Sequence, residues 1–198
     1  VSLLRSRNVR LRLKTPLCSW NEHQIDAMIQ LVESLGVSYN IDPHISPRDD
    51  GDTSPLHFRI STEARERIMR QQIESGALLN ERTEGGANCG LGRTTLAVDP
   101  EGNVFPCLSW KHEALGNVRE VRLRDLWQSS ERRKSAAATS DAANEKLLQA
   151  GENIAPLPFC PATAARKTGT PLEFYDDFLQ DLAMFETLKK DLPRLAAK

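Results

Sequence analysis

The sequence lacks two features that would place it in a simple class of protein. Its 26 Lys and Arg residues nearly balance its 27 Asp and Glu residues, so the formal net charge at pH 7 is −1. A general electrostatic binder of nucleic acid needs an excess of positive charge, which this balance excludes. No apolar run approaches the roughly 18 residues that a membrane-spanning helix requires. We therefore expect a globular chain with neither nucleic acid nor a membrane as its partner.

The N-terminus lacks an initiator methionine and shows no secretory signal pattern, so we expect the chain to be part of a longer protein. Cysteine is also scarce. The four cysteines, Cys18, Cys89, Cys107 and Cys160, are too few and too scattered for the disulfide framework of a small secreted protein. Metal-binding thiols in a reducing cytoplasm fit this usage better.

The first forty residues present a strand, a helix and a second strand. Residues 9–13 alternate in polarity and predict a strand that ends at the Lys14–Pro16 break. Asn21 and Gln24 are spaced as a capping box for a helix over 21–35, with Gly36 just past its end. Residues 37–42 predict the second strand. This order is typical of the crossover unit of a parallel sheet.

Shorter elements follow. A helix is expected from after Ser61 to about Ser75, and four glycines between 85 and 92 mark a boundary. Strands over 95–99 and 103–107 flank a turn at Gly102 and predict a hairpin. We expect further helices over 123–130, 136–150 and 171–190, with Trp127 as a core anchor and Pro171 near the start of the last helix.

Two cysteines flank the predicted hairpin. Cys89 lies just before its first strand and Cys107 ends its second, so the two thiols can approach each other at the open end. Thiolates at such a mouth can hold a soft metal. Cys160 adds a third thiol from a loop stiffened by prolines on both sides of it.

Three residues next to Cys89 suit a bulky inorganic group. Gly90 and Gly92 let the backbone approach it closely and offer amide groups to its sulfurs. The cation of Arg93 can steady a negatively charged cluster, although a role as a surface arginine explains it equally well.

Spacing alone leaves several interpretations of the thiols open. Zinc usually takes four N or S ligands in close pairs, and the chain has neither C-x₂-C nor H-x₃₋₅-H, which makes zinc the weaker metal. All the thiols can instead be buried and inert. A disulfide between Cys89 and Cys107 is geometrically possible but disfavoured in cytoplasm.

One longer pattern carries a resemblance. Cys89, twelve residues, Gly102, four residues and Cys107 are followed by Gly-Asn-Val at 116–118 and Leu-Arg-Asp-Leu-Trp at 123–127. This resembles the auxiliary-cluster domain, called SPASM or twitch, of radical SAM enzymes. The resemblance extends over about residues 9–178. Residues 9–43 are similar to the end of the partial TIM-like barrel that precedes this domain, and residues 47–52 are similar to the link in peptide-modifying members.

The resemblance implies ligand roles for Cys89, Cys107 and Cys160 toward an auxiliary [4Fe–4S] cluster. The single cysteine near 160 matches the one-cluster, twitch-like version of the domain and leaves the fourth ligand unassigned. We expect Cys18 to be a core or half-exposed thiol. The C-x₃-C-x₂-C motif that binds S-adenosylmethionine in this family does not occur in the sequence, so we expect that site upstream of Val1.

These observations predict an α/β fold in four parts. Residues 1–60 form the end of the barrel, 61–84 a linker helix, 85–170 the auxiliary-cluster domain and 171–198 a C-terminal helix. The implied function is the C-terminal portion of a radical SAM/SPASM enzyme, with an upstream barrel and a ribosomally made precursor peptide as partners. A non-catalytic iron–sulfur or peptide-binding module, or a structural zinc domain, is the alternative.

Overall fold

The computed structural model describes residues 1–48, 50–74, 82–151, 154 and 156–191. The chain divides into two compact units, Val1–Gln72 and Ile73–Lys198. Residue 49 of the 47–52 link, Ser75 at the end of a predicted helix and the chain beyond residue 191 lie outside the described residues. The predicted division into four parts stays a prediction.

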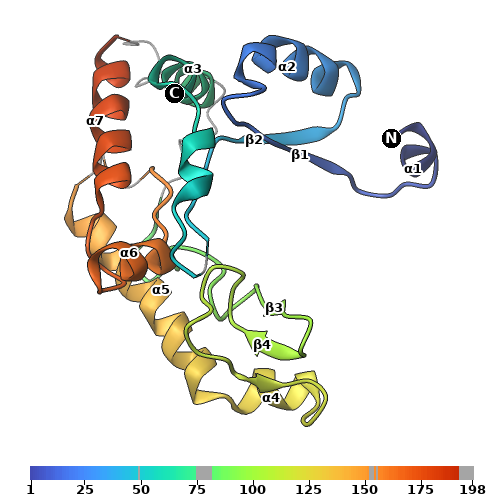
Figure 1. Ribbon diagram of the computed structural model, residues 1–198, viewed down its shortest axis with the longest axis vertical. Coiled ribbons are helices and arrows are strands. Elements are labelled where there is room, and N and C mark those ends of the chain that lie inside the picture. Colours follow the sequence, from blue (N-terminus) through green and yellow to red (C-terminus); the bar gives the residue numbers. More distant parts are fainter. Residues whose placement is uncertain (49, 75–81, 152–153, 155, 192–198) are drawn as a thin grey trace. The chain divides into compact units, whose positions relative to one another are not determined.

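The first unit contains the predicted crossover. Strand β1 (Arg12–Pro16) pairs in parallel with β2 (Ser38–Asp42), and the register runs from Arg12 opposite Ser38 to Pro16 opposite Asp42. Helix α2 (Ile25–Ser34) connects the strands and lies beside them (Figure 1). Its apolar face contributes to a core of five buried residues, Leu17, Ile25, Ile41, Ala64 and Ile68. The strand-helix-strand prediction is thereby confirmed.

The boundaries of this unit differ from the predicted ones. Strand β1 begins three residues later and continues through the expected break, because its pairing with β2 extends to Pro16. The capping box is wrong. The Asn21 side chain accepts a hydrogen bond from the Cys18 amide at 2.7 Å instead of capping, and a short 3₁₀ helix, η1 (Glu22–Gln24), precedes α2. Gly36 has a φ of +58° after the helix, as predicted.

Three further elements belong to this part of the chain. Helix α1 (Ser2–Ser6) and the 3₁₀ helix η2 (Ser54–Phe58) are short and were not predicted. Helix α3 (Thr62–Glu74) agrees with the predicted helix. Its residues Ala64 and Ile68 complete the core of the first unit.

The second unit begins with the predicted hairpin, formed by β3 (Ala97–Val98) and β4 (Asn103–Phe105). Gly102 in the turn has a φ of +92°, which suits glycine. A third strand, β5 (Gly116–Asn117), pairs antiparallel with β4 and was not predicted. Helix α4 (Leu123–Ser129) packs on this sheet through Leu126, which forms a buried cluster with Val104 and Leu115. Trp127 is only half-buried, so the core anchor of α4 is Leu126 instead.

Three helices complete the second unit. Helix α5 (Glu131–Gln149) starts five residues earlier than predicted, after Ser130 caps it by accepting from the Arg133 amide. Helix α6 (Pro161–Thr168) was not predicted and crosses close to α5 (Figure 1). Helix α7 (Asp176–Asp191) starts later than predicted and leaves Pro171 outside it, because Phe174 and Tyr175 pack on Phe159 first.

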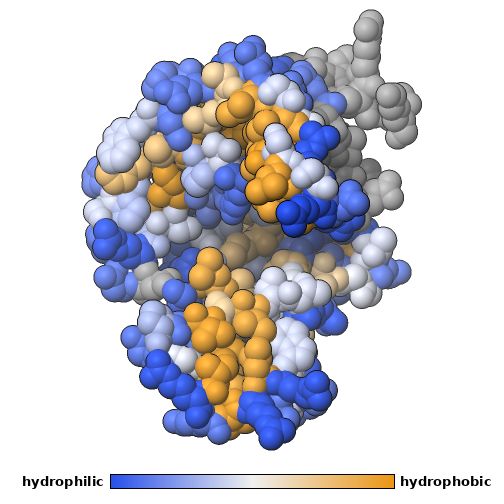
Figure 2. Space-filling model, turned by 90° about the vertical axis from the view of Figure 1, so that its right-hand side faces the viewer, coloured by the Kyte–Doolittle hydropathy of each residue, from blue (hydrophilic) through white to orange (hydrophobic). Residues whose placement is uncertain are grey.

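Hydrophobic side chains remain partly exposed on the hairpin and on α4. Figure 2 shows a strip of them in its lower part. The large hydrophobic residues exposed in this stretch of chain are Leu96, Val98, Leu108, Val118, Val121 and Leu123. Among the helices that the structure describes, none has both the length and the apolar character needed to cross a membrane.

Candidate metal centre

Backbone hydrogen bonds bring the Cys89 segment to the end of the hairpin that carries Cys107. The Gly92 amide donates to the carbonyl of Pro106 at 3.3 Å. The Thr95 hydroxyl makes hydrogen bonds at 2.9 Å to the Gly90 carbonyl and at 3.0 Å to that of Pro106. Pro106 directly precedes Cys107, so the segment that follows Cys89 is fixed against the residue before Cys107.

Cys107 and Cys160 lie on one apolar cluster. Both are half-buried and pack against four buried residues, Leu91, Trp110, Ala136 and Ala162. Leu91 is two residues beyond Cys89 in the chain. Helix α6 begins directly after Cys160, and Ala162 lies in its first turn. The three cysteine-bearing segments therefore meet at this cluster.

The Cys160 segment is held from two sides. The Asn88 side-chain amide donates to the carbonyl of Phe159 at 2.9 Å and so ties the residue before Cys89 to the residue before Cys160. Burial raises the pKa of Tyr175 to about 12, and a hydrogen bond with the Cys160 backbone offsets part of that effect. Tyr175 is therefore a neutral phenol at physiological pH, next to the Cys160 backbone.

Cys89 is exposed and receives contacts from helix α5. The Ser140 hydroxyl accepts from the Cys89 amide at 3.0 Å, donates to its carbonyl at 3.0 Å and lies 3.7 Å from its Sγ. Arg82 is close enough to Cys89 to interact with it electrostatically. Burial lowers the pKa of Arg82, and the interaction with Cys89 acts in the opposite direction.

The structure gives the two predicted glycines a packing role. A Cβ atom at Gly90 would lie 2.5 Å from Thr94 Oγ1, and one at Gly92 would lie 2.6 Å from the carbonyl oxygen of Arg133 on α5. Gly92 also has a φ of +64°. Neither residue can carry a side chain in this conformation. Their expected role toward a cluster stays a prediction.

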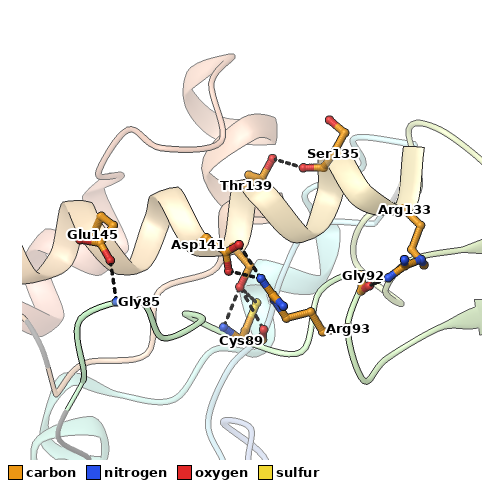
Figure 3. A network of polar contacts seen from close by, with 10 residues as sticks. Gly85, Cys89, Gly92, Arg93, Arg133, Ser135, Thr139, Asp141 and Glu145 are labelled. Atoms are coloured by element: carbon orange, nitrogen blue, oxygen red, sulfur yellow. Dashed lines mark hydrogen bonds and ion pairs between the residues drawn. The ribbon is translucent and has the colours of Figure 1, made fainter. Parts of the chain in front are cut away.

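Arg93 pairs with α5. Its guanidinium donates to the Asp141 carboxylate at 2.6 Å, and the side chains of both residues remain about two-fifths exposed (Figure 3). In the same network, Arg133 donates to the Gly92 carbonyl at 2.8 Å and Glu145 accepts from the Gly85 amide at 3.2 Å. These polar contacts thus hold the loop 85–93 along α5.

The donor set suits an iron–sulfur cluster. All four cysteines are free thiols; Cys107 and Cys160 are half-buried and Cys89 is exposed. Within the described ranges no three His, Cys, Asp or Glu side chains are grouped so as to hold a single metal ion such as zinc. A cluster takes one thiolate per iron, so its ligands stand further apart than those of one ion. Three soft thiolates from converging segments therefore fit a cluster by their chemistry.

Sequence reasoning missed the residues of α5 that support the Cys89 loop. Ser140 and Asn144 are almost fully buried, and Asn144 donates to the carbonyl of Thr83 at 3.0 Å. The only available signal was a row of small residues one or two turns apart, Ala136, Ser140 and Ala143. It marks a helix face that another segment approaches closely.

Comparison with known proteins agrees with this geometry. The family model described as SPASM, an iron–sulfur cluster-binding domain, matches residues 89–151, which include Cys89 and Cys107 and all of α5. No curated protein matches the chain in sequence.

Two solved structures have a similar fold. Both are of anSMEcpe with bound AdoMet, one carrying a polyhistidine tag and one native, at 12% sequence identity and with TM-scores of 0.56 and 0.57. The match covers 98% of this chain and 56% and 58% of those chains, so this chain spans little more than half of their length. The neighbour is an anaerobic sulfatase-maturating enzyme of the radical SAM/SPASM type. Residues 89–151 therefore match a SPASM iron–sulfur cluster-binding domain, and the chain shares its fold with part of a radical SAM/SPASM enzyme.

Proposed function

We propose that Cys89, Cys107 and Cys160 bind one auxiliary [4Fe–4S] cluster. The convergence of their three segments on the cluster of Leu91, Trp110, Ala136 and Ala162 carries this proposal. When bound, such a cluster supplies one-electron transfer or an iron site for substrate, at a potential set by burial and by hydrogen bonds to its sulfurs.

The chain's own residues have separable tasks in this proposal. The three thiolates bind iron, and the half-buried cation of Arg82 offsets negative charge near Cys89. Gly90 and Gly92 hold the Cys89 loop close to its neighbours. The Gly92 amide donates to the Pro106 carbonyl, so in this proposal the Gly90 amide is the one offered to the cluster. Arg93 contributes positive charge at the rim, reduced by its ion pair with Asp141.

We further propose that the chain is the C-terminal part of a radical SAM/SPASM enzyme that modifies a ribosomally made precursor peptide in the cytoplasm. The similarity of 98% of the chain to part of anSMEcpe supports this placement, as does the parallel β1–α2–β2 unit, which suits the end of a partial TIM-like barrel. S-adenosylmethionine would then act only in the intact enzyme, because the motif that binds it is not among these residues.

The ligand assignment is tested by reconstituting the full chain with iron and sulfide under anaerobic conditions. Replacing Cys89, Cys107 or Cys160 by Ala should abolish or sharply reduce bound iron and the broad visible absorption of a cluster. Cys18→Ala is the matched control, because Cys18 is a half-buried thiol of the other unit and should leave both unchanged. Full iron content in any of the three variants would reject that residue as a ligand, and a colourless zinc-loaded protein would favour the zinc alternative.

The placement in a longer enzyme has its own test. The reconstituted and reduced chain, given S-adenosylmethionine, should release no 5′-deoxyadenosine, since its thiols are far apart in sequence and match the auxiliary position. Adding an upstream radical SAM barrel should restore the product. Release by the chain alone, above a cluster-free control, would contradict the auxiliary assignment.

A further inference from the structure

Ser140 is the fully buried side chain that reaches Cys89 from α5. Its exposed fraction is 0%, and its hydroxyl lies within hydrogen-bond distance of the amide, the carbonyl and the sulfur of Cys89. The Ser140 carbonyl in turn accepts from the Asn88 amide at 3.1 Å. One helix residue thus contacts both residues at the start of the cysteine-bearing loop, and Asn88 extends this connection to Phe159 beside Cys160.

The Ser140 hydroxyl has fewer hydrogens than it has acceptors within reach. A serine hydroxyl has one hydrogen and two lone pairs. One lone pair of the Ser140 hydroxyl accepts from the Cys89 amide. Its single hydrogen faces two acceptors, the Cys89 carbonyl at 3.0 Å and the Cys89 Sγ atom at 3.7 Å, and can be donated fully to only one of them. Hydrogen bonds to charged acceptors are shorter and stronger than those to neutral ones. A thiolate at Cys89 therefore competes for this hydrogen better than a thiol does.

We infer that Ser140 is a positioning residue of the metal centre, which fixes the Cys89 backbone and donates its hydroxyl hydrogen to the Cys89 sulfur. This rests on the proposed ligand role of Cys89. The reduced form of a cluster has one more negative charge than the oxidised form, so a donor to its sulfur ligand stabilises the reduced form more. Ser140 accordingly raises the reduction potential of the cluster.

The test is a redox titration of the reconstituted full chain, followed by the EPR signal of the reduced cluster. Ser140→Ala removes the donor and should move the midpoint to more negative potential. At a fixed applied potential the ratio of reduced to oxidised cluster should fall roughly three- to tenfold, which is the contribution of one net hydrogen bond to an equilibrium. Ser140→Thr keeps a hydroxyl and should stay at the wild-type midpoint.

Thr139→Ala is the matched control on the same helix. The Thr139 hydroxyl donates along the helix to the Ser135 carbonyl at 3.1 Å, as Figure 3 shows, and its removal should leave the midpoint unchanged. A loss of packing alone would change stability or iron content without shifting the midpoint of the cluster that remains. The midpoint therefore separates a donor from a purely structural residue.

Each result has a defined meaning. A wild-type midpoint in iron-loaded Ser140→Ala overturns the inference. If Ser140→Ala binds no iron, the Ser140→Thr variant decides. A wild-type midpoint in the Thr variant supports the inference. A more negative midpoint, or loss of iron, in the Thr variant overturns it. Retention of iron by Cys89→Ala overturns the ligand assignment and this inference together. Loss of iron in that variant, with an unshifted midpoint in Ser140→Ala, overturns only the role of Ser140.

Discussion

At the scale of single residues, small side chains let α5 lie directly against the Cys89 loop. A methyl group at Gly92 would lie 2.6 Å from the Arg133 carbonyl oxygen and 2.8 Å from the Ala137 amide nitrogen. Both are backbone atoms of a helix, which cannot turn aside as the end of a long side chain can. Gly92 therefore determines how closely the cysteine-bearing loop approaches α5.

Gly92→Ala should destabilise the fold more than a glycine-to-alanine substitution at a site that has a positive φ but open space around the added Cβ. Gly169, which ends α6 with a φ of +85° and has no atom within 4 Å of an added Cβ, provides that comparison. We expect Gly169→Ala to lose about 1–2 kcal/mol from the left-handed backbone alone. Gly92→Ala should lose a further ~1–3 kcal/mol from overpacking. Urea unfolding of the full chain measures both, and equal losses would contradict the close approach to α5.

An ion pair between β1 and β2 predicts a dependence on pH. Burial raises the pKa of Asp42, but hydrogen bonds from Lys14 and the His44 amide outweigh it, so the pKa lies below its usual 3.8. Lys14 Nζ is 2.7 Å from the Asp42 carboxylate. Because the pKa in the folded state is lowered, the ionised carboxylate stabilises the fold above pH 3.8. This contribution is lost as the pH falls through the folded-state pKa.

Replacing Lys14 by Met should raise the pKa of Asp42, while Lys14→Arg should keep it low. An NMR titration of the Asp42 carboxyl carbon measures this directly. The Lys14 side chain is largely exposed, so the loss of stability at pH 7 should stay within about 1 kcal/mol. An unchanged pKa in the Met variant would mean that His44, through its amide and its charge, lowers the pKa of Asp42 without Lys14.

At the scale of elements, local patterns predicted the hairpin and most helices but not their ends. The β3–β4 turn is determined locally by Pro100 and Gly102, and the structure confirms the predicted hairpin. The end of β1 depends on its pairing with β2, and the late start of α7 depends on Phe174 and Tyr175 packing on Phe159. Such partners are distant in sequence, and no local pattern contains them.

In the candidate site, too, local features could be predicted from the sequence and long-range contacts could not. The positions of Cys89 and Cys107 at the ends of a hairpin follow from spacing, and the structure confirms that hairpin. The supporting contacts of Asn88 and Ser140 were not predicted, because α5 is rich in alanine and small polar residues and has no clear apolar stripe. Which of its faces is buried depends on the loop that packs against it.

The buried face of α5 leads to a paired prediction. Ala143 is 0% exposed, between Ser140 and Asn144, whereas Ala138 is exposed on the same helix. Alanine and leucine have similar helix propensity, so substitution by Leu tests packing alone. Ala143→Leu should destabilise the chain by about 1–3 kcal/mol, and Ala138→Leu should stay within ~0.5 kcal/mol of wild type. Chemical denaturation of both variants checks this, and similar stabilities would mean that α5 presents another face.

At the scale of the whole chain, the residues of the proposed centre belong to one unit. Cys89, Cys107 and Cys160 all lie within Ile73–Lys198, while the parallel strands and Cys18 lie within Val1–Gln72. Each unit has its own buried cluster, around Ile25 and Ile41 in the first and around Leu91 and Ala136 in the second. Metal binding at the three cysteines should therefore stabilise the unit Ile73–Lys198 and leave the core of Val1–Gln72 unchanged.

Hydrogen exchange on cluster-free and reconstituted full chain tests this separation. Ligands from three segments are joined only when metal is bound, and metal binding to such a set stabilises the folded state. We expect removal of the metal to speed amide exchange in the loops that carry Cys89 and Cys107 and in the first turn of α6. Amides of β1, α2 and β2 should exchange at the same rates in both states. Cys89→Ala, taken through the same reconstitution, should exchange like the cluster-free chain throughout. Equal changes in both units would show that they open together, and no change around Cys107 would mean that this residue does not bind the metal.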